Sequence, residues 1–328
     1  MIHVCFGLHD VSGHYSKFTG TTICSLFENL LTPPPQSITI HILHDNTLTQ
    51  DNRDKFIYLA RQYNQFVKFY NVEELCADKI AEFTDIFPHM KNSRVNIGFF
   101  YRLLILQVLP INIDKCIYLD SDTIVNLDIK ELWQIELGDK IFATVPETLN
   151  NGEVTSKYAL CIEGIVKVND YFNSGVMLIN LSILRNEQGK IKEGSLFCAK
   201  DLKYQRFADQ DILNYCFSTR YLKLPIKFNR FVVFARQNKE SALKGKIYHY
   251  VGSSNLGWGM SFDLNDPFSK LWIDYFVKTP WFNAETLSNF YKNFNELCQN
   301  IHVDHNRSMI KFSAALSAAV LAAASLSS

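Results

Sequence analysis

Short apolar runs alternate with amphipathic segments along the first part of the chain. The apolar run at 2–7 ends at a glycine, and the β-branched, alternating segment at 37–44 is a second candidate strand. A third short strand is predicted at 67–72, whereas 21–31 and 50–64 have the apolar spacing of helices. This alternation predicts an α/β fold with a mainly parallel sheet and helices on both faces.

The alternation continues into the later part of the chain. Residues 99–109 are apolar and end at Pro110, which predicts a buried helix. Further segments with a strand or helix pattern lie at 115–119, 175–180, 208–214 and 246–252. After about residue 262 the pattern becomes helical and rich in aromatic residues. We therefore predict a main domain at 1–262 and a small helical C-terminal extension at 263–328.

Composition narrows the class of protein. The 328 residues carry 33 basic and 33 acidic side chains, and 47% are hydrophobic. Such a chain is not expected to be disordered. Its equal numbers of acidic and basic side chains argue against a nucleic-acid partner. The eight cysteines form no CxxC pair, which is typical of reduced thiols in a cytoplasmic protein. We find no signal peptide and no run of about 20 apolar residues, and interpret the Ala/Ser-rich tail at 312–328 as a weak helix or an ill-ordered tail.

Asp120 and Asp122, called the D-x-D pair below, are the first candidates for chemistry. They directly follow the apolar run KCIYL, and ligands of open α/β sheets gather at such carboxyl ends of strands. At a strand-to-loop corner, two carboxylates can converge on one hard cation, which would stabilise a departing diphosphate. A solvated acidic turn is the alternative interpretation, because D-x-D is a common tripeptide.

Other polar residues have candidate roles alongside simpler explanations. His249 is a candidate third ligand because imidazole suits manganese and zinc, and a hydrogen-bonded core histidine is the alternative. Asp209, Gln210 and Asp211 open a predicted helix, where acids are also favourable against the helix dipole. Arg102 lies in an apolar helix and needs a carboxylate or phosphate partner unless it reaches solvent.

Two more polar residues precede a predicted strand. Asn173 and Ser174 could donate hydrogen bonds to a sugar hydroxyl, or they could form the turn before that strand. Neither a P-loop nor a G-x-G-x-x-G fingerprint occurs in the chain. The candidate chemistry therefore does not rest on a glycine-rich phosphate loop.

Together these segments resemble glycosyltransferase family 8. This family contains bacterial lipopolysaccharide and lipooligosaccharide galactosyl- and glucosyltransferases, and glycogenin. The most specific motifs, in chain order, are YLDSDTIV, YFNSGVMLINL and ADQDILN, and they are accompanied by ITIHILHDN, LKLPIKFN and IYHYVGSSNLGW. The resemblance covers roughly residues 1–260.

The resemblance implies a GT-A fold, in which a Rossmann-like sheet binds a nucleotide sugar together with a divalent cation. Residues 1–262 would be the catalytic domain, the donor a UDP-hexose and the cation Mn²⁺ or Mg²⁺. Asp120, Asp122 and His249 would be the metal ligands, with the D-x-D pair also near the ribose. The other implied contacts are Leu8, His9 and Tyr15 at the uracil, Ser121 at the nucleotide, Arg102, Asn173, Asp209 and Gln210 at the donor sugar, and Gly252 and Asn255 at the diphosphate.

Members of this class retain the anomeric configuration, so the new bond forms on the face that the nucleotide leaves. Asp209 and Gln210 are the implied catalytic residues. Gln210 matches the residue discussed as a nucleophile, but a neutral amide is a poor nucleophile. We therefore favour front-face attack, in which the leaving diphosphate takes the acceptor proton and the metal stabilises its charge.

Two segments depart from the family pattern. Many members have Ala-x-Asp-x-x-Tyr after the first strand, whereas this chain has Gly7-Leu-His9-Asp10 and an insertion before Tyr15. The usual H-x-x-G-x-x-K-P-W reads HYVGSSNLGW here, so Asn255 stands where a lysine is expected to meet the diphosphate. A metal and backbone donors could carry that charge, and a changed donor or weak activity is the other consequence.

Two other functions remain as alternatives. The missing lysine suggests a catalytically weak, glycosyltransferase-like protein that binds nucleotide sugars. Asp120-Ser-Asp122-Thr123 suggests a D-x-D-x-T phosphatase, although that motif usually opens its domain. Measurable turnover of a nucleotide sugar, including slow hydrolysis without acceptor, would reject the first of them.

The expected acceptor is a glycan or lipid-linked oligosaccharide in lipopolysaccharide or other surface-glycan synthesis. Because lipid-linked acceptors lie at the inner leaflet, we expect a cytoplasmic protein, with peripheral contact to the inner face of the plasma membrane. The aromatic segment at 272–291 would make that contact, or its rings would pack the C-terminal helices onto the domain. The sequence does not fix the donor sugar, the linkage or the oligomeric state.

Overall fold

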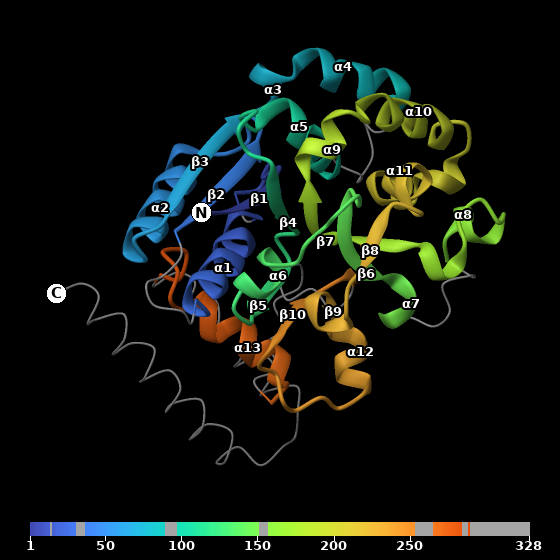
Figure 1. The fold of residues 1–328 in the computed structure, drawn as a ribbon. Coiled ribbons are helices and arrows are strands. Elements are labelled where there is room, and N and C mark those ends of the chain that lie inside the picture. Colours follow the sequence, from blue (N-terminus) through green and yellow to red (C-terminus); the bar gives the residue numbers. More distant parts are fainter. Residues whose placement is uncertain are drawn as a thin grey trace.

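A seven-stranded sheet flanked by helices forms the centre of the protein (Figure 1). The computed structural model describes residues 1–13, 15–30, 37–88, 97–150, 157–252, 265–283 and 288. In the strand order β3-β2-β1-β4-β7-β6-β8, the first four strands are parallel, β7 is antiparallel to β4 and β6, and β8 is parallel to β6. The strands are β1 (Ile2–Leu8), β2 (Ile38–His44), β3 (Phe66–Asn71), β4 (Lys115–Leu119), β6 (Phe142–Pro146), β7 (Phe172–Asn180) and β8 (Tyr221–Lys223). The predicted α/β fold with a mainly parallel sheet is confirmed.

Alternate residues of the central strands pack into two hydrophobic cores, one on each face of the sheet. In β1, Val4 belongs to one core and Cys5 to the other, and in β4 the same holds for Leu119 and Tyr118. The first core is covered by α1 (Tyr15–Glu28) and α2 (Gln50–Gln62), and the second by the 3₁₀-helix η2 (Ile97–Leu104), α10 (Gln188–Cys198) and α11 (Ala208–Phe217). Because both faces are covered, the central strands are nearly continuous apolar runs.

Two helices differ from the sequence-based prediction. Helix α1 begins at Tyr15 rather than near residue 21, because the carboxylate of Asp10 accepts hydrogen bonds from the N–H groups of Tyr15 (2.7 Å) and Ser16 (2.9 Å). The segment predicted as a helix at 99–109 is the 3₁₀-helix η2 followed by the single turn α5 (Ile105–Val108). A three-residue period aligns side chains along η2, whose last five residues are all buried.

A second, three-stranded sheet lies against the main sheet, in the order β5-β10-β9. Its strands are β5 (Thr123–Asn126), β9 (Arg230–Phe231) and β10 (Lys246–His249). Strand β10 is antiparallel to β5 and parallel to β9, which pairs His249 with Thr123 and with Phe231. This register places His249 beside the loop that joins β4 to β5.

The remaining helices are short connections around the two sheets (Figure 1). They are α3 (Val72–Leu75), α4 (Ala77–Ile86), α6 (Lys130–Trp133), α7 (Glu147–Asn150), α8 (Ala159–Ile162), η4 (Val168–Asp170), α9 (Leu181–Arg185), η5 (Leu202–Gln205), η6 (Ile226–Phe228) and α12 (Val232–Gln237). The seven cysteines within the described residues are free thiols.

Helix α13 (Pro267–Phe276) and the residues after it pack aromatic side chains onto α1 and α2. Trp272 and Trp281 are 3% and 7% exposed. The indole N–H of Trp281 donates to Oδ1 of Asn52 at 2.8 Å, and its ring lies so close to Gly20 that a Cβ there would be 2.2 Å from Cζ3. These rings therefore pack the C-terminal segment onto the domain, which is the second of the two alternatives given for them.

Several predictions for the C-terminal part fall on residues that the structure does not describe. The boundary near residue 262, the rings at 290 and 291 and the tail at 312–328 all lie outside the described residues. The division into two units stays a prediction. Within the part of the chain that is described, no helix is long and apolar enough to cross a membrane.

Candidate active site

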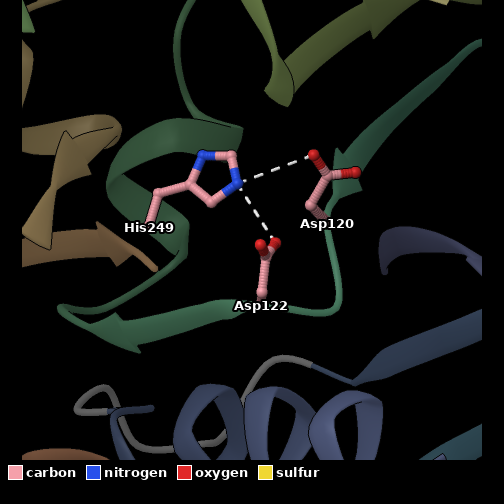
Figure 2. A group of neighbouring side chains, drawn as sticks. All are labelled: Asp120, Asp122 and His249. Atoms are coloured by element: carbon pink, nitrogen blue, oxygen red, sulfur yellow. Dashed lines mark hydrogen bonds and ion pairs between the residues drawn. The ribbon is translucent and has the colours of Figure 1, made fainter. Parts of the chain in front are cut away.

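Three ligand-type side chains converge where the main sheet meets the small sheet (Figure 2). Asp120 directly follows β4, Asp122 directly precedes β5, and His249 is the last residue of β10. Nε2 of His249 lies 3.1 Å from Oδ1 of Asp122 and 3.7 Å from Oδ2 of Asp120. One ligand atom from each residue lies within 4.8 Å of the other two. The structure thus brings the three predicted metal ligands together.

The chemistry and surroundings of this cluster fit a divalent cation. Two carboxylates and one imidazole suit Mn²⁺, and the carboxylate oxygens suit Mg²⁺. His249 is buried, which lowers the pKa of its imidazole, but the carboxylates of Asp122 and Asp120 outweigh burial and raise that pKa above its ordinary value. The negative field that favours a proton at this point also favours a metal cation.

Hydrogen bonds to neighbouring elements hold the loop that carries the D-x-D pair. The N–H of Asp120 donates to the carbonyl oxygen of Gly175 in β7 at 2.8 Å, and the hydroxyl of Thr123 donates to the carbonyl oxygen of Asp120 at 2.8 Å. Ser121 is buried, and its hydroxyl oxygen accepts a hydrogen bond from Thr19 of α1 at 2.8 Å. Ser121 therefore anchors the loop to α1, and its contact with the nucleotide stays a prediction.

Arg102 is a buried cation that joins two of the acidic side chains. Its Nη2 lies 2.8 Å from Oδ1 of Asp120, and its Nε lies 2.7 Å from Oδ2 of Asp209. Its Nη1 donates to the carbonyl oxygen and the hydroxyl of Ser174, and the guanidinium lies over the ring of Tyr118. Burial raises the pKa of Asp209 to about 6, although the charge of Arg102 opposes this shift. The buried arginine thus has two carboxylate partners.

Gln210, on α11, is held through its carbonyl oxygen. Oε1 accepts hydrogen bonds from Nδ2 of Asn173 and from the N–H of Ser174, both at 3.0 Å. Nδ2 of Asn173 also donates to Oε1 of Glu147 at 3.0 Å, and all four residues are buried. Asn173 and Ser174 lie within β7, so they do not form a turn before the strand, which was one of the two alternatives given for them. Together with Arg102, these side chains form one buried polar group beside the metal cluster.

The residues predicted at the uracil lie near the carboxyl end of β1. Leu8 is fully buried in the core, so its contact with a base stays a prediction. Nδ1 of His9 is bonded to the carboxylate of Asp45, which also accepts a hydrogen bond from Tyr101 at 2.6 Å. Burial opposes ionisation of Asp45, but these hydrogen bonds lower its pKa. Burial and the charges of the D-x-D pair raise the pKa of Tyr15.

Only one of the two residues predicted at the diphosphate lies within the described part of the chain. Gly252 lies three residues after the end of β10, is exposed and has a φ of +63°, which L side chains rarely adopt. Asn255 lies outside the described residues. The consequence of the missing lysine therefore stays a prediction.

Sequence reasoning missed three residues of this region. Glu147 directly follows β6 and Asp45 directly follows β2, as Asp120 follows β4. An acidic residue at the carboxyl end of a buried strand was the available signal for both. Asn229, whose Oδ1 lies 3.0 Å from Nδ1 of His249, carries no such signal in the sequence.

A comparison with models of protein families decides the family. The model described as glycosyl transferase family 8 matches residues 8–255 of the 328. The chain belongs to glycosyltransferase family 8. The matched range runs from Leu8 to Asn255 and contains every residue predicted for the site. The resemblance inferred from the motifs is confirmed.

Curated relatives of this family 8 protein include bacterial enzymes and a stress protein. A lipopolysaccharide 1,2-glucosyltransferase of Escherichia coli is 27% identical over 228 residues, which are 69% of this chain and 62% of that relative. The chain therefore spans only about three fifths of the length of that relative. General stress protein A of Bacillus subtilis is 20% identical over 294 residues, which are 84% of this chain and 94% of the relative.

Solved structures agree on the fold. The galactosyltransferase LgtC, in complex with donor and acceptor sugar analogues, has a TM-score of 0.62 at 20% identity, covering 87% of this chain and 98% of its own. The bifunctional glycosyltransferase WbbM has a TM-score of 0.63 at 19% identity, covering 89% of this chain and 51% of its own. The predicted GT-A fold is confirmed.

Family membership removes the phosphatase alternative. The family and the fold of this chain are those of a glycosyltransferase. The phosphatase motif is also not met, because D-x-D-x-T requires a threonine two residues after the second aspartate, where this chain has Ile124.

Proposed function

We propose that this family 8 protein is a retaining hexosyltransferase that moves galactose or glucose from a UDP-sugar to a glycan acceptor. The observation that carries the proposal is the convergence of Asp120, Asp122 and His249 on one point beside Arg102. The names of two similar proteins, a lipopolysaccharide 1,2-glucosyltransferase and a galactosyltransferase, support these two sugars. They also support a lipopolysaccharide or other surface glycan, lipid-linked or free, as the acceptor. The reaction would then occur in the cytoplasm, with peripheral contact to the inner face of the plasma membrane.

The two carboxylate oxygens of Asp120 have different partners. Oδ1 of Asp120 is bonded to Nη2 of Arg102 at 2.8 Å and to the hydroxyl of Tyr118 at 3.1 Å. Oδ2 is the oxygen that faces His249. Arg102 and Tyr118 thus orient Oδ2 toward the point where Mn²⁺ or Mg²⁺ would bind with Asp122 and His249. A cation there would stabilise the charge that develops on the UDP diphosphate as the sugar leaves.

The contacts of Gln210 support front-face attack over a covalent intermediate. A nucleophilic amide would have to attack through Oε1, but the N–H of Ser174 and Nδ2 of Asn173 already donate to that oxygen. Donated hydrogen bonds withdraw electron density, and freeing the oxygen would leave buried donors unpaired. Gln210 is therefore proposed to shape the donor-sugar side of the site with Asp209, while the leaving diphosphate takes the acceptor proton.

Calorimetric titration with UDP, with and without Mn²⁺, tests the nucleotide and metal site. We expect binding that depends on Mn²⁺ in the wild type and is lost in the Asp120→Asn, Asp122→Asn double variant. The matched control removes two exposed charges that do not belong to the cluster, Asp139→Asn and Asp274→Asn, and should bind like the wild type.

Each outcome of this titration separates the candidate functions. Binding without Mn²⁺ would contradict the metal site but leave a nucleotide-binding protein. Absence of binding with and without Mn²⁺ would contradict the UDP-sugar donor. Metal-dependent binding would justify a screen of UDP-galactose and UDP-glucose for transfer and for slow hydrolysis without acceptor.

A catalytically weak protein that binds nucleotide sugars is the second candidate. It is favoured by Asn255, which replaces the lysine expected at the diphosphate. Metal-dependent UDP binding with no hydrolysis of either UDP-hexose would support this candidate over the transferase. An Asn255→Lys variant that gained turnover would identify the missing charge as the cause.

A further inference from the structure

The side chain of Asn229 lies behind His249, on the opposite side of the ring from the D-x-D pair. Oδ1 of Asn229 is 3.0 Å from Nδ1 of His249, whereas Nε2 of His249 faces Asp122 at 3.1 Å. Both Asn229 and His249 are buried, at 0% and 3% exposure. A histidine nitrogen can either donate or accept, so the direction of this bond depends on how the amide of Asn229 is oriented.

A backbone group determines that orientation. The N–H of Gly175 can only donate, and the side-chain atom of Asn173 that it meets at 2.9 Å is therefore the acceptor Oδ1. The same oxygen lies 2.7 Å from the amide of Asn229, so the atom of Asn229 that faces it is the donor Nδ2. Oδ1 of Asn229 then faces His249, and an acceptor at that point requires a proton on Nδ1 of the ring.

The contact made by Nδ2 of Asn173 supports the same orientation of its side-chain amide. Its Nδ2 lies 3.0 Å from the side-chain atom of Gln210 that the N–H of Ser174 also meets at 3.0 Å. A backbone N–H identifies that atom of Gln210 as the acceptor Oε1, and hence its neighbour on Asn173 as a donor. Two independent backbone N–H groups, of Gly175 and Ser174, thus give the same orientation for Asn173.

We propose that Asn229 is a positioning residue of the metal cluster, whose Oδ1 holds a proton of His249 on Nδ1 and so reserves Nε2 as the ring nitrogen that binds a cation together with the D-x-D pair. This inference rests on the proposed metal-dependent function. Metal-binding histidines generally donate the N–H of their other ring nitrogen to a carboxylate, a carbonyl oxygen or water, and loss of that partner typically weakens metal affinity by about 10- to 100-fold. Through Asn173, the same amide chain connects the metal cluster to Gln210 on the donor-sugar side.

Two substitutions at position 229 separate the acceptor from the rest of the side chain. Asn229→Leu removes the acceptor, whereas Asn229→Asp keeps an oxygen for His249 and loses the donor to Asn173. Asn29→Leu is the matched control, because Asn29 is equally a buried amide but bonds to Ser25, Val125 and Tyr275. It should change folding stability without changing the cluster.

The first readout is Mn²⁺ affinity, measured without donor by the electron paramagnetic resonance of free Mn²⁺. We expect a loss of about tenfold or more in Asn229→Leu, a smaller loss in Asn229→Asp and none in Asn29→Leu. The second readout is the proton-nitrogen spectrum of protein labelled with ¹⁵N-histidine and free of metal. A buried, hydrogen-bonded N–H at Nδ1 exchanges slowly, so the wild type should show its cross-peak, identified by its absence in His249→Gln.

The outcomes distinguish failure of this role from failure of the proposed function. A wild type that binds Mn²⁺ no better than Asn229→Leu overturns the role of Asn229, and so does a ring protonated on Nε2 with no proton on Nδ1. A wild type that binds no Mn²⁺ overturns the metal-dependent function as well. If Asn229→Leu does not fold, the comparison of Asn229→Asp with the wild type decides, since a tenfold loss there contradicts the role of the acceptor oxygen.

Discussion

Gly175 in β7 and His249 in β10 lie so close together that a Cβ atom on Gly175 would be 2.3 Å from Cε1 of the imidazole. The same Cβ would be 2.6 Å from Oδ2 of Asp120. No other residue type fits between these two groups without moving one of them. The absence of a side chain at 175 is therefore what lets the imidazole from the small sheet reach the carboxylate at the end of β4.

Replacement of this glycine should separate the metal ligands. We expect Gly175→Ala to weaken Mn²⁺-dependent UDP binding by roughly tenfold or more, because the methyl group displaces His249 or Asp120. Calorimetry measures the binding, and circular dichroism shows whether the variant is folded. Gly189→Ala in α10 is the control, since a Cβ there meets nothing within 4 Å. A folded Gly175→Ala protein with wild-type affinity would contradict the metal cluster.

Gln210→Ala tests the front-face mechanism. We expect turnover to fall by roughly 10- to 100-fold through misplacement of the donor sugar, with the anomeric configuration of the product still retained. Proton NMR of the product gives the configuration, and intact-mass spectrometry of the enzyme with UDP-hexose detects adducts. A hexose found covalently attached to Gln210 in the wild type would refute this mechanism.

Asp211 should make folding stability depend on pH. Burial raises the pKa of this carboxyl from 3.8 to about 7, although Tyr171 donates a hydrogen bond to it at 2.7 Å. The folded state therefore binds the proton more tightly than the unfolded state. The stability that the neutral carboxyl contributes is fully present below about pH 4 and is lost as the pH rises through about 7.

Urea unfolding between pH 4 and pH 8 measures this effect. Because the amide introduced by Asp211→Asn stays neutral, the free energy of unfolding of this variant should exceed that of the wild type increasingly as the pH rises, by up to about 4 kcal/mol. Asp274→Asn, at an exposed position of α13, should follow the wild type at every pH. A difference between Asp211→Asn and the wild type that does not change with pH would contradict the prediction.

Trp281 tests whether the C-terminal segment belongs to the folded core. We expect Trp281→Ala to lower the free energy of unfolding by about 3–5 kcal/mol, because it leaves a cavity beside Gly20 and removes the donor to Oδ1 of Asn52. Urea unfolding measures the change, and Phe66→Ala, at a ring that is 53% exposed, should cost far less. Equal effects of the two substitutions would mean that residues 265–283 are not part of the core.

Much of the main sheet could be predicted because its strands are buried on both faces. The segments predicted at 37–44 and 115–119 correspond to Ile38–His44 and Lys115–Leu119. Strands β5 and β9 were missed because, at four and two residues, they are too short to show a period. The early start of α1 was missed because it depends on the Asp10 carboxylate and not on apolar spacing.

The sequence by itself determined the strand that ends at Asp120, the acidic residues placed there and, through its motifs, the family. Only the tertiary structure decided that His249, 127 residues after Asp122, lies within 3.1 Å of it. It also decided that Gly175 leaves room for this contact and that Asn229 is hydrogen-bonded to the other nitrogen of the imidazole. The physical reason is that a local apolar pattern specifies which faces of a strand are buried. The pairing of β10 with β5 depends on hydrogen bonds between segments far apart in the chain.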